Sequence, residues 1–133
     1  MKILNFGSCN IDYVYTVDHI VKPGETEAAD RLEVFPGGKG LNQSIAIARA
    51  GGDVCHAGCI GSDGEMLLNV LKDSGVDTAY LKTLDVKGGH AIIQVNAKGE
   101  NSIFLYAGSN NMITEELVDR VLENFDSDSI TLL

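Results

Sequence analysis

The chain has 133 residues, of which 44% are hydrophobic and 22% charged, as in one ordinary globular domain. Its formal net charge is −9 and its ten lysines and arginines are scattered, which argues against a nucleic-acid partner, because phosphate binding needs clustered basic side chains. No apolar run approaches the ~18 residues of a membrane span and no secretion signal opens the sequence, so we expect a cytoplasmic protein with no membrane partner.

The first part of the chain predicts a strand, a hairpin and a helix. The run KILNF is a short β-type segment that breaks at Gly7 and continues into the polar turn GSCNID. Residues 13–36 are two extended segments separated by the turn KPGET, which predicts a hairpin. A helix is expected from Lys39 or Gly40 to Ala50, because its apolar residues recur at helical spacing and two glycines follow it.

The rest of the chain continues the alternation of strands and helices. DVCHAGCIG predicts a buried strand, DGEMLLNVLKDSG a helix with Gly75 at its C-cap, and VDTAYLKTL a further extended segment. This order indicates βαβ units and a parallel sheet. Residues 90–107 predict a second hairpin about the turn NAKGEN. A last helix is expected in TEELVDRVLENF, with Thr114 as its N-cap, and SITLL predicts the start of a buried strand.

The two cysteines and the histidine of the predicted strand DVCHAGCIG are a possible metal site. Cys55 and Cys59 would share one face of an extended strand while His56 points to the other, and no second ligand pair follows at zinc spacing. We therefore interpret them, with Cys9, as reduced thiols and small fillers of a buried strand.

Two polar turns are the candidate binding site, because ligands of open α/β sheets bind beyond the carboxyl ends of the strands. GSCNID contributes Asn10 and Asp12, which are two residues apart and would face the same way in an extended chain. PGGKGLNQS contributes Gly38, Lys39 and Asn42 ahead of a helix. A carboxylate and amides that donate and accept can hold a polyol, and glycines let backbone N–H groups approach it.

Other interpretations of PGGKGLN fit the sequence less well. A P-loop needs Ser or Thr after its Gly-Lys, whereas Gly40 follows Lys39 here. The dinucleotide fingerprint G-x-G-x-x-G is not present either. Taken alone, the segment is about as compatible with a plain glycine-rich loop entering a helix, and Asp12 alone with a turn residue.

Several motifs in order, GSCNID, PGET, PGGKGLNQSIAIARAGG, GCIGSDGEMLLNVLKDSGV and AGSNN, resemble the ribokinase branch of the PfkB family of carbohydrate kinases. The resemblance runs from Met1 to Leu133, and GGKGxNQ with Gln43 is its most specific part. It implies a Rossmann-like three-layer α/β sandwich, of which residues 1–133 would be the N-terminal portion. The hairpins at 13–36 and 90–107 would be inserted in that domain as a small β-sheet lid.

The same resemblance implies roles for the two polar turns. Asn10 and Asp12 would bind sugar hydroxyls, and Gly38, Lys39 and Asn42 would line the same pocket. Two departures from the family pattern stand out: residues 108–111 match its GAN turn only partly, so they receive no role, and GSDGEMLL is two residues shorter than usual.

Family members are about twice as long as this chain. Their catalytic GAGD segment with its aspartate base, their ATP and Mg²⁺ sites and a sugar-contacting glutamate lie beyond the position of Leu133. The resemblance thus implies the sugar-binding half of an ATP-dependent carbohydrate kinase, truncated and inactive alone, with no catalytic, cofactor or metal residue in this chain. The parent would phosphorylate a primary hydroxyl of a pentose or related sugar. The alternative is a non-catalytic sugar-binding module, or an assembly module that dimerises through its lid strands.

Overall fold

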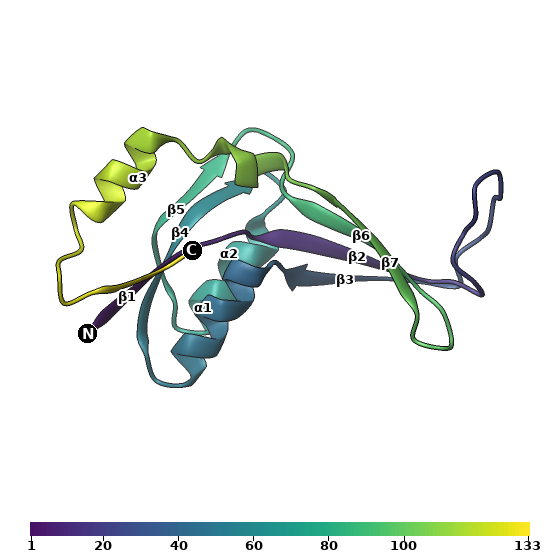
Figure 1. Ribbon diagram of the computed structural model, residues 1–133, viewed down its shortest axis with the longest axis horizontal. Coiled ribbons are helices and arrows are strands. Elements are labelled where there is room, and N and C mark those ends of the chain that lie inside the picture. The colour runs from purple at the N-terminus through teal and green to yellow at the C-terminus, as the bar shows by residue number, and fades with distance from the viewer.

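The computed structural model describes residues 1–133, which form a three-layer body and a small sheet that projects from it (Figure 1). The body is built on a parallel sheet of order β5-β4-β1-β8, whose strands are β1 (Lys2–Phe6), β4 (Asp53–Gly61), β5 (Asp77–Leu84) and β8 (Ile130–Leu132). The small sheet has the order β3-β2-β6-β7, with β2 (Asn10–Thr16), β3 (Arg31–Gly37), β6 (His90–Val95) and β7 (Asn101–Tyr106). The helices are α1 (Lys39–Arg49), α2 (Glu65–Asp73) and α3 (Glu115–Leu122), with a 3-10 turn η1 (Gly108–Met112) before α3. None of these helices combines the length and the apolar character that a bilayer crossing requires.

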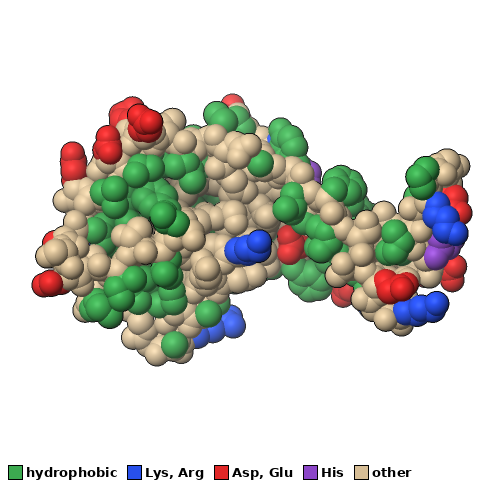
Figure 2. All heavy atoms as spheres, in the orientation of Figure 1, with side chains coloured by type: hydrophobic (Ala, Val, Ile, Leu, Met, Phe, Trp, Pro, Cys, Tyr) green, Lys and Arg blue, Asp and Glu red, His purple; other side chains and the backbone are tan.

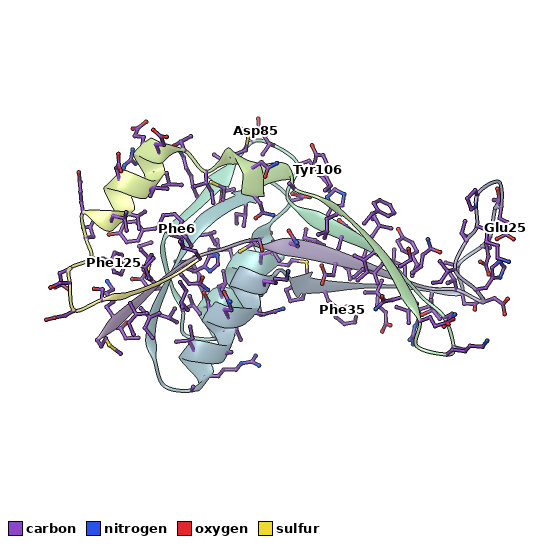
Figure 3. The ribbon with its side chains drawn as sticks, in the orientation of Figure 1. Phe6, Glu25, Phe35, Asp85, Tyr106 and Phe125 are labelled. Atoms are coloured by element: carbon purple, nitrogen blue, oxygen red, sulfur yellow. The ribbon has the colours of Figure 1, made fainter.

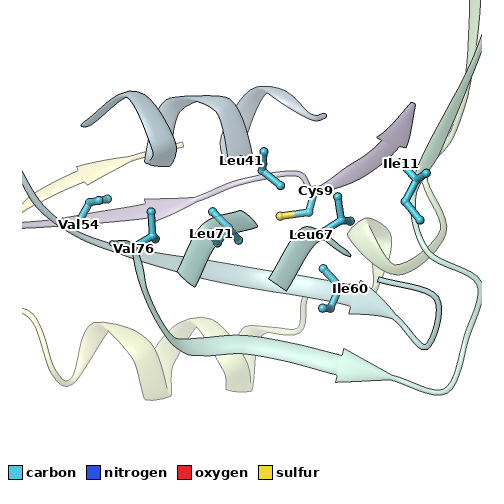
Figure 4. Close-up of a cluster of buried hydrophobic side chains, with 8 residues drawn as sticks. All are labelled: Cys9, Ile11, Leu41, Val54, Ile60, Leu67, Leu71 and Val76. Carbon is cyan, nitrogen blue, oxygen red and sulfur yellow. The ribbon is translucent and has the colours of Figure 1, made fainter. Parts of the chain in front are cut away.

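The core of the body lies on both faces of its sheet. On one face, Leu41 of α1 and Leu67 of α2 pack with Ile60 of β4 (Figure 4). On the other face, Leu117 and Val121 of α3 pack against β1 and β4. Because β4 is covered on both sides, it is buried from Val54 to Gly61, as expected of a central parallel strand. The predicted three-layer α/β sandwich is confirmed.

A close backbone contact joins β1 to α1. A Cβ at Gly7, just after β1, would lie 2.5 Å from the Cα of Gly40 in the first turn of α1. Only two glycines allow the chains to approach so closely. This contact places the turn before β2 and the N-terminus of α1 side by side, at the carboxyl edge of the sheet.

The small sheet consists of two antiparallel hairpins, β2 with β3 and β6 with β7, and both were predicted. Parallel pairing of β2 with β6 joins them into one sheet, which no local pattern indicated. A long loop between β2 and β3, which contains Glu25, forms the far tip of the sheet (Figure 3). Strand β7 is exposed along its whole length.

Three local predictions need correction. SITLL is no buried strand: β8 pairs with β1 only, at the edge of the sheet, and Ile130 is 41% exposed. The C-cap of α2 is Ser74, and Gly75 follows it with a φ of 84°. Residues 108–112 form a 3-10 turn that the sequence did not predict. Thr114 caps α3 as predicted, because its side chain accepts a hydrogen bond from the Leu117 N–H.

Candidate functional site

All five residues proposed from the two polar turns line one open hollow of about 320 Å³. It lies where the turn before β2, the start of α1 and the small sheet meet. We call it the hollow, and its lining consists of Ser8, Asn10, Asp12, Gly38, Lys39, Asn42, Ala91, Ile93, Ile103 and Leu105. The structure therefore brings together residues that are up to 97 positions apart in the chain, from Ser8 to Leu105.

Asp12 is the acceptor of the hollow. Its carboxylate makes no hydrogen bond or ion pair within the protein, and partial burial raises its pKa above the usual value. Neighbouring Gly37 makes room for it, because a Cβ there would lie 2.2 Å from the Asp12 Oδ2 atom. A half-buried carboxylate without a partner is available to accept hydrogen bonds from a ligand.

The start of α1 forms the polar floor of the hollow. Gly38 precedes the helix with a φ of 99°, a conformation that favours glycine, and no side chain caps the helix. The Leu41 N–H donates to the Ser8 carbonyl at 3.0 Å, which fixes α1 to the turn before β2. Lys39 and Asn42 are exposed on this first turn, so a ligand meets their side chains and the positive end of the helix dipole.

Asn110 is a residue that the sequence analysis missed. It lies in η1, behind the hollow, and its amide bonds both to the backbone of Cys9 and to the Asn10 side chain. The motif AGSNN pointed to this turn, but Ser109 differs from the family pattern and no role was given. In the structure Ser109 is buried, and its hydroxyl accepts from the Gly89 N–H at 3.4 Å.

The small sheet supplies an apolar side to the hollow. Ala91 and Ile93 come from β6, and Ile103 and Leu105 come from β7. They share one face because Ala91 pairs with Leu105 and Ile93 pairs with Ile103. Local sequence could not reveal them, since their approach to Asp12 depends on the pairing of β2 with β6.

A fully buried polar chain lies beneath the hollow. The Asn5 amide donates to the Gly40 carbonyl at 2.9 Å and to the Ser44 hydroxyl at 3.0 Å. Ser44 Oγ lies 2.8 Å from Nδ1 of His56, and Nε2 of His56 lies 3.2 Å from the Gly7 carbonyl. A carbonyl only accepts, so the imidazole proton belongs on Nε2 and Ser44 donates to Nδ1. This series of hydrogen bonds thus connects β1, α1 and β4 beneath the hollow.

His56 and Cys9 are uncharged in this setting. Burial lowers the pKa of His56 to about 4 and raises the pKa of the Cys9 thiol to about 12. The Cys9 sulfur lies 3.2 Å from Nε2 of His56, and Cys55 and Cys59 face away from that ring on the strand. His56 acts here as a hydrogen-bonding core residue.

A second polar cluster lies away from the hollow, in the loop between β2 and β3. His19 is held there by Asp18, Glu25 and Glu27 at 3.1, 3.0 and 3.6 Å. The hydrogen bonds that the protonated imidazole donates to Asp18 and then to Glu25 raise the pKa of His19. These contacts order the exposed tip of the small sheet.

Comparison with known proteins identifies the family. The model of the pfkB family carbohydrate kinases matches residues 1–131. The chain belongs to this family. The resemblance drawn from its motifs is thereby confirmed.

Among pfkB-family relatives, the chain is 41% identical over 119 residues to a ribokinase of Staphylococcus aureus, covering 86% of this chain and 39% of that protein. It is also similar to the crystal structure of a Cryptococcus neoformans ribokinase in complex with ADP, with a TM-score of 0.77 and 48% identity over 81% of this chain and 35% of the other. An Arabidopsis thaliana ribokinase complexed with ribose and ATP matches with a TM-score of 0.73 and 30% identity, over 81% and 36%. The chain spans less than half the length of these relatives.

Proposed function

We propose that this chain is the sugar-binding half of an ATP-dependent carbohydrate kinase that phosphorylates a primary hydroxyl of a pentose or related sugar. The observation that carries the proposal is the hollow: Asn10 and Asp12 of β2 and Asn42 of α1 lie around one cavity. Membership of the pfkB family supports the reaction class.

The proposed chemistry of the hollow is sugar recognition. Asp12 would accept hydrogens from sugar hydroxyls, while Asn10, Asn42 and Lys39 would donate to sugar oxygens. The side chains of Ile93, Ile103 and Leu105 would cover the C–H surface of the sugar and exclude water from it. Held in this way, the sugar presents its reacting hydroxyl in a fixed position, which is the main protein contribution to phosphoryl transfer.

ATP and Mg²⁺ belong to the proposal as the phosphoryl donor and its counterion. The relatives solved with ADP, or with ribose and ATP, support a nucleotide as the second ligand. The residues of the hollow provide one carboxylate and otherwise amides, a lysine, a serine and apolar groups, which suit a polyol better than a divalent cation. We therefore assign no residue of this chain to ATP, Mg²⁺ or the catalytic base, and we propose a cytoplasmic location.

The test of the proposed function is turnover by the full-length parent protein. Purified parent is incubated with ATP, Mg²⁺ and a panel of pentoses, hexoses and their deoxy forms, and ADP release is measured. We expect one or a few pentoses to be phosphorylated, with a KM far below that of the other sugars. Absence of turnover with every sugar would refute the proposal.

A second function, assembly of a homodimer through the small sheet, is favoured by its exposed apolar side chains (Figure 2). Phe35 and Leu105 are 47% and 67% exposed on the face that carries Asp12, and Phe104 is 63% exposed on the other face. Exposed apolar strands of this kind are common at protein interfaces.

Sedimentation velocity tests this second function. We expect the wild-type protein to sediment as a dimer and Leu105→Ser to shift it toward the monomer. Leu122→Ser, at a 42% exposed leucine of α3, is the matched control and should leave the dimer intact. A wild-type monomer at all concentrations would exclude dimerisation.

A further inference from the structure

We infer that Asn110 is a positioning residue: it holds the side-chain amide of Asn10 in one orientation, so that the hollow presents a fixed hydrogen-bond donor to the sugar. This inference rests on the proposed function, because it concerns the sugar-binding role of Asn10. The inference adds Asn110 of η1 to the site. It also predicts that the sugar must offer a hydrogen-bond acceptor to Asn10.

The orientation of the Asn110 amide is fixed by the backbone of Cys9. Its Oδ1 atom accepts from the Cys9 N–H at 3.0 Å, and its Nδ2 atom donates to the Cys9 carbonyl at 3.2 Å. A backbone N–H only donates and a carbonyl only accepts. A flipped amide would place its NH₂ group against the Cys9 N–H and its oxygen against the Cys9 carbonyl. Only one orientation of the Asn110 amide therefore satisfies both contacts.

The orientation of Asn10 follows from that of Asn110. The Nδ2 group of Asn110 also donates to Oδ1 of Asn10, at 2.8 Å. The Asn10 oxygen is therefore engaged inside the protein. Its own Nδ2 group has no acceptor within the protein and remains for a ligand in the hollow that Asn10 lines.

Gly89 closes this junction from the other side. A Cβ at Gly89 would lie 2.0 Å from Nδ2 of Asn110 and 2.6 Å from Oδ1 of Asn10. The Gly89 carbonyl accepts from the Ile11 N–H at 3.0 Å, so its backbone is tied to β2. The two amides are thus packed against backbone that cannot move aside easily, which opposes rotation of either side chain.

The fixed donor defines the chemistry of the ligand. Asn10 and Asp12 are two positions apart on β2, so their side chains lie on the same face of the strand. That face therefore presents a hydrogen-bond donor, from Asn10, beside an acceptor, from Asp12. A hydroxyl donates one hydrogen and accepts through its oxygen, so neighbouring hydroxyls can satisfy both side chains. A sugar without the hydroxyl opposite Asn10 leaves this donor unpaired. We therefore expect the site to select for an oxygen at that one ring position.

The experiment uses the full-length parent with its sugar and the series of monodeoxy analogues. In the wild type, the analogue that lacks the hydroxyl opposite Asn10 should show a KM about tenfold higher than the sugar. Asn10→Ala identifies this analogue, because it should remove that difference. Asn110→Ala and Asn110→Asp should each reduce the difference to about twofold or less, since neither side chain can donate to Oδ1 of Asn10.

Two controls separate positioning from a general structural role. Asn111→Ala changes the exposed neighbour in the same turn and should keep the tenfold difference. In an Asn10→Ala background, Asn110→Ala should change the KM of the sugar by less than about twofold, because the residue it acts through is gone. Full discrimination in Asn110→Ala, or independent effects of the two substitutions, would overturn the inference.

Hydrogen exchange of the Cys9 amide tests the contact of Asn110 without requiring any enzymatic turnover. If the wild-type parent phosphorylates no sugar, the proposed function fails, and the Cys9 amide still reports on Asn110. We expect this amide to be protected in the wild type and in Asn110→Asp, which retains the acceptor, but to exchange at least about tenfold faster in Asn110→Ala. Equal protection in all three proteins would overturn the positioning role.

Discussion

Asp12 is the charged acceptor of the hollow, and its substitution is the most direct test of the site. Asp12→Ala in the full-length parent should raise the sugar KM by roughly 10- to 150-fold, because a hydrogen bond to a charged group is worth about 1.5–3 kcal/mol. Asn42→Ala removes a neutral partner and should raise it by only about 2- to 10-fold. Steady-state kinetics measures both, with Asp53→Ala, an exposed carboxylate at the start of β4, as the control. Unchanged kinetics would exclude Asp12 from sugar binding.

The buried imidazole of His56 makes stability depend on pH. Its pKa is about 4 in the folded protein against an ordinary value of 6.5, so the unfolded chain takes up a proton first as the pH falls. The stabilisation is complete above pH ~6.5 and is lost between pH ~6.5 and ~4. Between pH 7.5 and 5 this one group should cost about 2 kcal/mol of unfolding free energy.

Urea unfolding of the wild type and His56→Gln at pH 7.5 and 5 measures this loss. Glutamine does not titrate, so the stability difference between the two proteins should shrink by about 2 kcal/mol at the lower pH. A difference that is the same at both pH values would show that His56 is protonated in the folded protein or accessible to solvent.

At the scale of elements, the junction of the turn before β2 with α1 depends on Gly38. Its φ is 99°, and a Cβ there would lie 2.6 Å from the Ser8 carbonyl oxygen and 3.0 Å from the Asn10 nitrogen. Gly38→Ala should therefore suffer both backbone strain and a clash, and should lower the unfolding free energy and raise the sugar KM together.

Gly51→Ala is the matched control for this substitution. Gly51 follows α1 with a φ of 86°, and a Cβ there meets nothing within 4 Å. It should cost only the ~1–2 kcal/mol of the left-handed conformation, with an unchanged KM. Thermal or urea unfolding compares the two variants. Equal losses of stability would mean that the close approach of Gly38 to Ser8 contributes nothing.

At the scale of the whole molecule, the chain carries one side of the proposed site. Calorimetric titration with the preferred sugar should give weak or absent binding to the 133-residue chain and clearly tighter binding to the full-length parent. The reason is that the hollow is open in this chain, and under the proposed function the full-length parent would add a further sugar-contacting residue, the glutamate that the resemblance to the family implies. Equal affinities would show that the hollow binds sugar without any further residues.

The sequence predicted most elements of the fold because their determinants are local. The turn residues of KPGET and NAKGEN set the two hairpins, and helical spacing followed by glycines set α1. The five residues of the hollow could be proposed because GSCNID follows the carboxyl end of β1, where open α/β sheets bind ligands, and because the glycine-rich segment PGGKGLN opens helix α1. The burial of β8 was predicted wrongly, since a short apolar segment does not reveal whether one or two strands flank it.

The sequence by itself determined the family, the order of strands and helices and the polar residues of the hollow, because motifs, turn chemistry and periodicity are properties of neighbouring residues. Tertiary structure alone decided the apolar side of the hollow, the buried chain through His56 and the contact of Asn110 with Asn10. Each of these joins residues that are distant in the chain: Asn110 and Cys9 are 101 positions apart, and the pairing of β2 with β6 brings Ile93 and Leu105 to Asp12. Such contacts exist only once the two sheets have formed. Which group donates and which accepts in each of these hydrogen bonds can therefore be seen only in the folded structure.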